Sequence, residues 1–108
     1  MAKTFTIKAL ADGQLPAAPA ALYTVPASTN TIIKTITLVN TDAVQRTMNL
    51  YVNASGVNRR IIPQDIPLEA KESLVWDDEL TLETGDMIQG DASAAVIVDY
   101  VISGVEET

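Results

Sequence analysis

Residues 31–39 read Thr31-Ile32-Ile33-Lys34-Thr35-Ile36-Thr37-Leu38-Val39, a run dominated by β-branched and apolar side chains. Side chains of this kind are favoured on the pleated, half-buried surface of a sheet. Asn40, Thr41 and Asp42 follow, and short polar side chains of this type hydrogen-bond their own backbone in turns. The stretch therefore predicts a strand over residues 31–39 that ends in a turn at residues 40–42.

The residues after this turn alternate with a period of two, as in a half-buried strand. We expect this strand to pair antiparallel with residues 31–39. Extended structure resumes at residues 58–62, and the prolines that follow confine that segment to an edge or a corner. The alternation divides residues 48–53 into an inward set, Met48, Leu50 and Val52, and an outward set, Asn49, Tyr51 and Asn53.

The second half of the chain contains one competing signal. Residues 68–76 are rich in Leu, Glu, Ala and Lys, which favour a helix, but the window is short and lacks a sustained apolar face. A hairpin with its tip at Ala70-Lys71 is preferred. Residues 80–82 and 87–88 predict further strand segments, separated by a turn at Gly85-Asp86. The last strand is predicted to have one apolar face, formed by Val96, Val98, Tyr100 and Ile102.

The first segment also alternates, with Phe5, Ile7 and Ala9 on one face. Residues 11–21 are rich in proline and alanine, which predicts a stiff linker or arm. Two placements stay open for the strand at residues 2–10. It completes its own sandwich, as terminal strands commonly do, or it adds to the open edge of a neighbouring subunit.

Seven or eight short strands separated by turns predict an all-β fold, an antiparallel β-sandwich of jelly-roll type. A chain of 108 residues has the size of one domain, so we expect a single sandwich over residues 1–108. Residues 1–21 would form the possible N-terminal strand and arm, and residues 22–108 the core.

Cysteine and histidine are both missing from the sequence. Their absence excludes a thiolate nucleophile, an imidazole base and a soft-ligand zinc or copper site. Catalysis by the remaining carboxylate, lysine, tyrosine or hydroxyl groups needs a shaped pocket that no motif indicates. We therefore expect neither enzyme activity nor a cofactor or metal.

Acidic residues outnumber basic ones by fourteen to seven, which gives a formal net charge of -7 at pH 7. A negative protein repels phosphate, so no nucleic-acid partner is expected. The first 60 residues carry six basic and two acidic side chains, whereas the rest carry one basic and twelve acidic. This asymmetry either serves solubility or gives neighbouring subunits complementary faces.

No signal peptide or membrane span is expected, and synthesis in a cytoplasm is the default. The first residues lead into an alternating segment, not an unbroken apolar stretch. The longest apolar run, residues 94–98, is far shorter than the roughly 20 residues of a spanning helix.

Several side chains are candidates for contacts with a partner. Phe5 and Tyr100 are expected in the core, while Tyr51 and Trp76 are uncommitted aromatic residues. The pair Arg59-Arg60 either binds a partner's carboxylates or forms a solvated edge. Phe5 also joins the candidates if the first strand reaches a neighbouring subunit. The candidate protein–protein contacts are Phe5, Ile7, Tyr51, Arg59, Arg60 and Trp76.

The run Asp77-Asp78-Glu79 allows two interpretations. Clustered carboxylates can bind a hard cation such as Ca²⁺, but the spacing matches no EF-hand loop. A solvated loop is the preferred interpretation, because clustered charges are usually exposed.

The order of several pieces resembles small β-sandwich proteins encoded among the structural genes of tailed bacteriophages. The resemblance spans about residues 20–106 and is strongest to head-decoration, or cementing, proteins with jelly-roll folds. The pieces are Leu22-Tyr23-Thr24-Val25-Pro26-Ala27, Ile33-Lys34-Thr35-Ile36-Thr37-Leu38-Val39-Asn40-Thr41, Asn49-Leu50-Tyr51-Val52-Asn53, the stretch from Leu80 to Gly90, and the stretch from Asp99 to Glu106.

This resemblance implies a phage virion protein made in the host bacterial cytoplasm, and two functions remain open. In the first, a homodimer or trimer binds the outside of the major capsid protein lattice and stabilises the head. In the second, the chain is a tail or fibre module that binds a host receptor or joins tail components. The length favours the first function, because the chain is one domain without a long attachment region.

Overall fold

The computed structural model describes residues 3–108, which form ten β-strands. Within these residues there is no helix long and apolar enough to cross a membrane. The strands are β1 (Phe5–Gln14), β2 (Ala20–Thr24), β3 (Asn30–Asn40), β4 (Arg46–Ala54), β5 (Val57–Arg60), β6 (Ile66–Leu68), β7 (Ser73–Trp76), β8 (Leu80–Leu82), β9 (Met87–Ala92) and β10 (Val98–Glu107).

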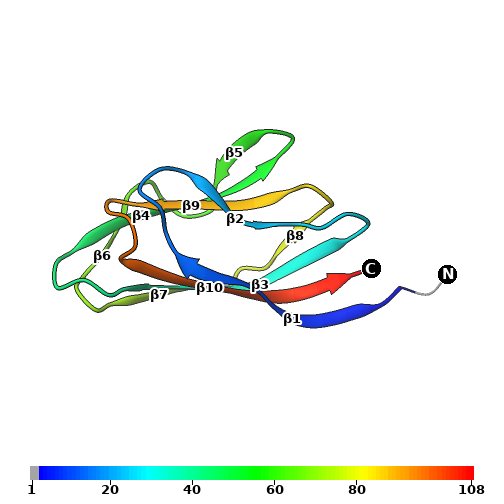
Figure 1. Ribbon diagram of the computed structural model, residues 1–108, viewed down its shortest axis with the longest axis horizontal. Helices are drawn as coiled ribbons and strands as arrows, with labels where there is room; N and C mark the ends of the chain where they lie inside the picture. The colour runs from blue at the N-terminus through cyan, green and yellow to red at the C-terminus, as the bar shows by residue number, and fades with distance from the viewer. Residues whose placement is uncertain (1–2) are drawn as a thin grey trace.

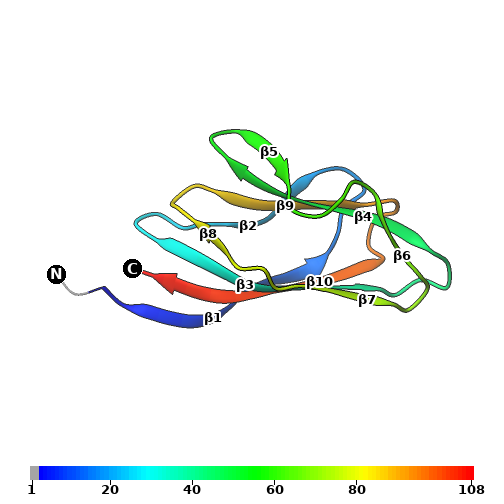
Figure 2. The same ribbon diagram turned by 180° about the vertical axis from the view of Figure 1, so that it is seen from behind.

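The strands build two antiparallel sheets that face each other (Figure 1 and, from behind, Figure 2). Sheet A has the order β1-β10-β3-β7, with β8 also on β3. Sheet B has the order β2-β9-β4-β5, with β6 also on β4. The first four strands thus pair with the later strands in reverse chain order. A chain that doubles back and is rolled into two sheets in this way is a jelly roll.

The predicted fold class, an antiparallel β-sandwich of jelly-roll type, is therefore confirmed. The ten strands of residues 3–108 fill eight sheet positions, because β7 and β8 share one edge of sheet A and β5 and β6 share one edge of sheet B. The number of strands is therefore larger than the seven or eight that the sequence predicts. Three strands, β1, β3 and β10, are ten or eleven residues long and not short as expected.

The core lies between the sheets and is built by alternate side chains of the long strands. Ile36 and Leu38 of β3, Leu50 of β4 and Ile102 of β10 are fully buried there. The β3–β10 ladder shifts register between Ser103 and Gly104. A Cβ at Gly104 would collide with the backbone carbonyl of Ile32, so this close approach of two strands requires glycine.

The expected pairing of residues 31–39 with residues 48–53 is wrong. β3 lies in sheet A and β4 in sheet B, so the two strands face each other across the core. The intervening turn crosses between the sheets and is fixed by the fully buried Asn40. Its Nδ2 donates to the backbone carbonyls of Val44, Leu68 and Glu69 at 2.9, 3.0 and 3.2 Å.

The N-terminal strand extends further than predicted. Residues 11–14, expected in a linker, continue β1 after a register shift between Ala9 and Ala11, and Leu15 is fully buried in the core. The whole strand pairs with β10 of its own chain, from Phe5 opposite Glu107 to Gln14 opposite Asp99. The linker prediction thus fails for residues 11–15, because one bulge lets the alternation continue past Leu10. It also fails for residues 20–21, which are the first residues of β2 and pair with β9.

The turn predicted at Ala70-Lys71 is confirmed, and residues 68–76 are not helical. The flanking strands do not pair with each other, however, since β6 lies on β4 and β7 lies on β3. The segment is a crossing between sheets and not a hairpin. Val96, expected on the apolar face of the last strand, is exposed in the turn before β10.

Candidate binding surface

The outer face of sheet A is unusually apolar for the solvent side of a sandwich. Residues paired across an antiparallel ladder point to the same face, so the register defines rows of outward side chains. Ile7, Val105 and Ile32 form one row across β1, β10 and β3. Val101, Thr37 and Val75 form another across β10, β3 and β7. Between them lies a row of small side chains, Ala9, Ser103 and Thr35.

These apolar side chains are accessible in the isolated chain. Ile7 is 90% exposed and Phe5, at the end of the same strand, is 66% exposed. Beside them a groove of about 340 Å³ is lined by parts of β1, β3, β8 and β10. The outward side chains of a sheet that faces water are normally polar. The apolar outward side chains of sheet A are instead typical of a surface that contacts another molecule.

Carboxylates stand at both ends of this apolar face. Asp99 accepts a hydrogen bond from Gln14 Nε2 at 3.0 Å, and Glu107 accepts one from Asn30 Nδ2 at 3.1 Å. Both amides are neutral, so they orient the two carboxylates without neutralising them. Among residues 3–108, the ion pairs are Lys8–Glu106, Lys34–Glu79 and Arg46–Asp42, which do not include these two carboxylates.

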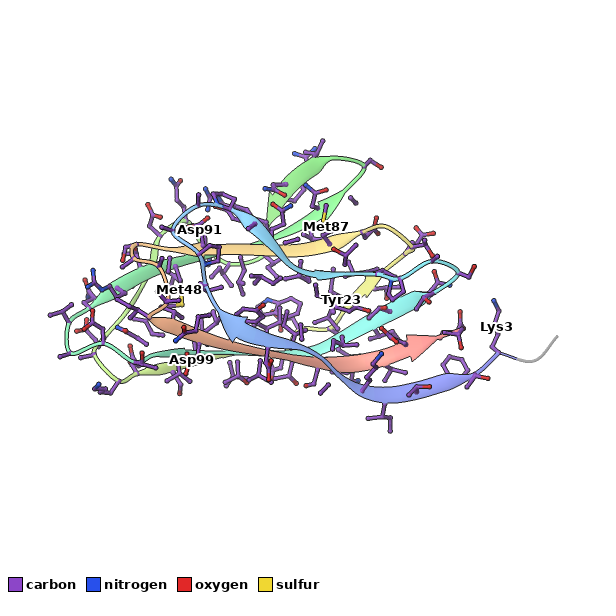
Figure 3. The ribbon with its side chains drawn as sticks, viewed as in Figure 1. Lys3, Tyr23, Met48, Met87, Asp91 and Asp99 are labelled. Atoms are coloured by element: carbon purple, nitrogen blue, oxygen red, sulfur yellow. The ribbon has the colours of Figure 1, made fainter. Side chains whose placement is uncertain are left out.

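A polar clasp joins the two sheets behind the end of this face. The Tyr23 hydroxyl on β2 donates to Glu106 Oε2 on β10 at 2.7 Å and lies 2.9 Å from Thr31 Oγ1 on β3. Figure 3 shows Tyr23 between the sheets. Lys8 Nζ donates to the other carboxylate oxygen of Glu106 at 3.1 Å. Burial, reinforced by the Glu106 carboxylate, raises the pKa of Tyr23 to about 12.

The hydrogen bond from Tyr23, supported by Lys8, holds the pKa of Glu106 below its usual value. Glu106 is therefore ionised at neutral pH although its side chain is buried. The buried polar atoms of the clasp all have partners, so the clasp links the two sheets as a satisfied network.

The outer face of sheet B carries a second closed network. Asn49 Nδ2 donates to Asp91 and Asp65, and the Tyr51 hydroxyl donates to Asp91 Oδ2 at 2.9 Å. The guanidinium of Arg60 lies 5.0 Å from the centre of the Tyr51 ring and donates to Asn49 Oδ1. Burial, together with the bond to Asp91, raises the pKa of the Tyr51 hydroxyl.

The candidate contact residues are thus divided among three places. Phe5 and Ile7 lie together on the exposed face of sheet A, which corrects the expectation that Phe5 is in the core. Tyr51 and Arg60 meet on sheet B, where Tyr51 is buried and not free for a partner. Trp76 is opposite the buried Ile36 and packs against the core.

Arg59 belongs to β5 and is exposed. The hairpin formed by β4 and β5 projects from the body of the sandwich (Figures 1 and 2). The inward set on β4 is as expected, since Met48 and Leu50 are in the core and Val52 packs against it. The outward set, Asn49, Tyr51 and Asn53, lies on the outer face but is buried there. They are covered by polar side chains of the neighbouring segments: Arg60 and Asp65 hydrogen-bond Asn49, and Asn58 accepts from Asn53.

The acidic loop at residues 77–79 has one defined contact. Glu79 Oε1 accepts from Lys34 Nζ at 2.9 Å, and both side chains are about half exposed. Within residues 3–108, no three acidic side chains gather closely enough to hold a metal ion.

The sequence places Val101 opposite the apolar face of the last strand, but it does not identify Ile32, Val75 or Val105 as surface residues. Each stands in an apolar or β-branched run, and such runs do not reveal which face turns to the core. The available signal is that β3 and β10 carry apolar residues on both faces. Only one face of each strand can turn to the core, so the apolar residues of the other face must lie on the outside of the sheet.

No protein-family model and no curated protein matches the sequence. Solved structures do share the fold. The capsid protein chain in virus-like particles of the extra small virus of the giant freshwater prawn Macrobrachium rosenbergii has a TM-score of 0.53 at 13% identity, covering 99% of this chain and 79% of that one. A chain of the acid-stable capsid of Helicobacter pylori bacteriophage KHP30 has a TM-score of 0.50 at 12% identity, covering 99% and 94%.

What these chains share with this one is the fold. The likeness runs through the whole sandwich and not one sheet, since it covers 99% of this chain in both cases. Both chains come from capsid particles. On this fold the present chain carries two closed polar networks and one open apolar face, and such a face suits binding to another protein.

Proposed function

We propose that this chain is a structural protein of a virus particle. At the finer level it is a decoration protein of a bacteriophage head, which binds the outside of the major capsid protein lattice and stabilises it. The single observation that carries the proposal is a jelly roll, the fold shared with the capsid chains, that presents an open apolar face on sheet A.

The proposal gives the chain no catalytic role. Its buried polar side chains, in the Tyr23–Glu106 clasp and around Asn49, hydrogen-bond each other.

We propose further that the chain acts as a homodimer or trimer, because closed symmetry is the rule among soluble oligomers. Sedimentation equilibrium of the purified protein, alone and with shells present, measures this state; monomer under both conditions contradicts it.

Binding to the assembled lattice stabilises the shell by mass action at every occupied site. Many copies multiply a modest energy per site. Particles that lack the protein should therefore assemble and then release DNA at a lower temperature than complete particles.

The test is a thermal release assay with a DNA-binding dye on particles with and without the protein. Adding the purified chain back should restore the release temperature, while an unrelated acidic protein at the same concentration should not. Equal release temperatures with and without the chain would contradict the stabilising role.

A further inference from the structure

We infer that the outer face of sheet A is the surface that seats on the shell, and that the shell presents there an apolar patch edged by lysine or arginine side chains. The inference rests on the proposed function and adds to it the contact face and the chemistry of the partner surface. The face is defined by the outward residues of β1, β10, β3 and β7.

The apolar part of the face needs a cover. Ile7, Val101 and Val75 are each about half exposed or more and lie in two rows that are separated by the row of small side chains. β1 is also an edge strand whose outer side has no partner within residues 3–108. Long edge strands with exposed apolar side chains invite association unless they are covered.

The charges decide between a second copy and a different partner. Asp99 marks one end of the face and Glu107 the other, and both are oriented by neutral amides. Asp12 adds a further carboxylate beside Val101. The cation on this face, Lys34, is paired with Glu79.

Lys8 and Lys3, the two cations in and next to β1, do not neutralise these carboxylates. Lys8 binds Glu106. Figure 3 shows Lys3 extending toward the side of the facing sheet, away from the outer face. At the Asp99 end, Lys71 donates to the Thr41 carbonyl. The outer face therefore presents an apolar middle with carboxylates toward both ends.

A second copy fits such a face poorly. In a two-fold, face-to-face dimer with aligned strands each end of the face meets an end of the partner's face, and both ends carry carboxylates. Like charges brought together in this way oppose association. A surface with cations around an apolar centre complements both features.

The area of the face is suited to a weak contact that is repeated over many copies of a partner. The strands β1, β10 and β3 are about ten residues long, and the shorter β7 and β8 share the fourth position. With a spacing of about 4.8 Å these four positions give a rectangle of roughly 20 by 33 Å. That is about 650 Å², somewhat below the roughly 800 Å² that each partner contributes to a standard interface. Contacts of this size are effective when they are repeated over a lattice.

The apolar arm of the test compares two valines of matched exposure on different sheets. Val101, on the face, is 49% exposed, and Val57, on β5 of sheet B, is 47% exposed. Binding of Val101→Glu and Val57→Glu to purified shells stripped of the protein is measured by co-sedimentation. We expect Val101→Glu to bind on the order of 100-fold more weakly, since it buries an unpaired charge, and Val57→Glu to bind like wild type.

The charge arm replaces carboxylates by their isosteric amides. Asp99→Asn with Glu107→Gln should weaken binding about 10-fold at low salt and flatten the salt dependence. Glu69→Gln is the matched control, because Glu69 also accepts from a neutral amide, that of Gln45, but lies in the β6–β7 turn.

The outcomes separate the two proposals. If wild type binds shells and Val101→Glu binds equally well, the face is wrongly assigned while the decoration role stands. If wild type does not bind shells, the proposed function itself fails. If wild type sediments as a dimer that Val101→Glu abolishes, the occupant is a second copy and the partner chemistry is wrong. If the amide variants bind as wild type does at all salt concentrations, the basic edge of the partner is wrong.

Discussion

The Tyr23–Glu106 clasp makes a quantitative prediction about stability. Replacing Tyr23 by Phe keeps the buried ring and removes the hydroxyl that donates to Glu106 at 2.7 Å and meets Thr31 at 2.9 Å. A hydrogen bond to a charged group contributes about 1.5–3 kcal/mol, and Glu106 keeps Lys8 as a partner. We expect the free energy of unfolding to fall by about 2 kcal/mol at pH 7, which lowers the melting temperature by roughly 8 °C in a domain of this size.

The pH dependence follows from the two shifted groups. The folded-state pKa of Glu106 is lowered, so its stabilisation is present above its unfolded pKa, about 4.3, and is lost as the pH falls through the folded value. The difference between wild type and Tyr23→Phe should therefore shrink in acid. The pKa of Tyr23 is raised to about 12, so wild type should also lose stability between pH 10 and pH 12, and the variant should lose less.

The assay is urea unfolding followed by circular dichroism at several pH values. Tyr100→Phe is the control, because Tyr100 is equally buried but its hydroxyl is not among the hydrogen-bond donors or acceptors of residues 3–108. It should cost less than about 0.5 kcal/mol, the usual effect of a substitution that breaks no specific interaction. A loss for Tyr23→Phe equally small at pH 7, or one unchanged between pH 7 and pH 3, would refute the clasp.

Three further changes test the fold. Gly104→Ala should prevent folding, as seen by loss of the thermal transition, because its Cβ meets the Ile32 carbonyl; Gly56→Ala, which meets no atom within 4 Å, should cost only the strain of its positive φ, about 1 kcal/mol. Asn40→Ala should cost about 2–4 kcal/mol in urea unfolding, since three backbone carbonyls lose their donor. Leu50→Ala should cost about 2–5 kcal/mol by leaving a cavity, and a smaller effect would place Leu50 outside the rigid core.

The sequence predicts elements of this fold well where local chemistry decides them. The strand at residues 31–39, the turn at Ala70-Lys71 and the edge at β5 follow from side-chain type and alternation. Pairing partners do not follow, because β3 bonds to β10, which is more than 50 residues away in the chain. Alternation records that a strand has two faces and does not record which other strand lies beside it.

The candidate surface is predictable only in part. Phe5 and Ile7 are found from their alternation in the first strand, whereas the rest of their rows depends on the register of β10 and β3. Tyr51 resembles a free aromatic residue in the sequence, yet β5 and Arg60 cover it. Local patterns identify these side chains as apolar or aromatic, and long-range packing decides whether they meet water.

The central claim, that the chain is a structural protein of a virus particle, is tested most directly by counting it in particles. Virions purified from the source of this sequence are analysed by quantitative mass spectrometry against their major capsid protein, and the chain is located with a labelled antibody in the electron microscope. The account predicts many copies, in fixed proportion to the capsid protein and distributed over the head. Absence from purified particles would contradict the central claim, and a few copies confined to the tail would contradict the decoration role.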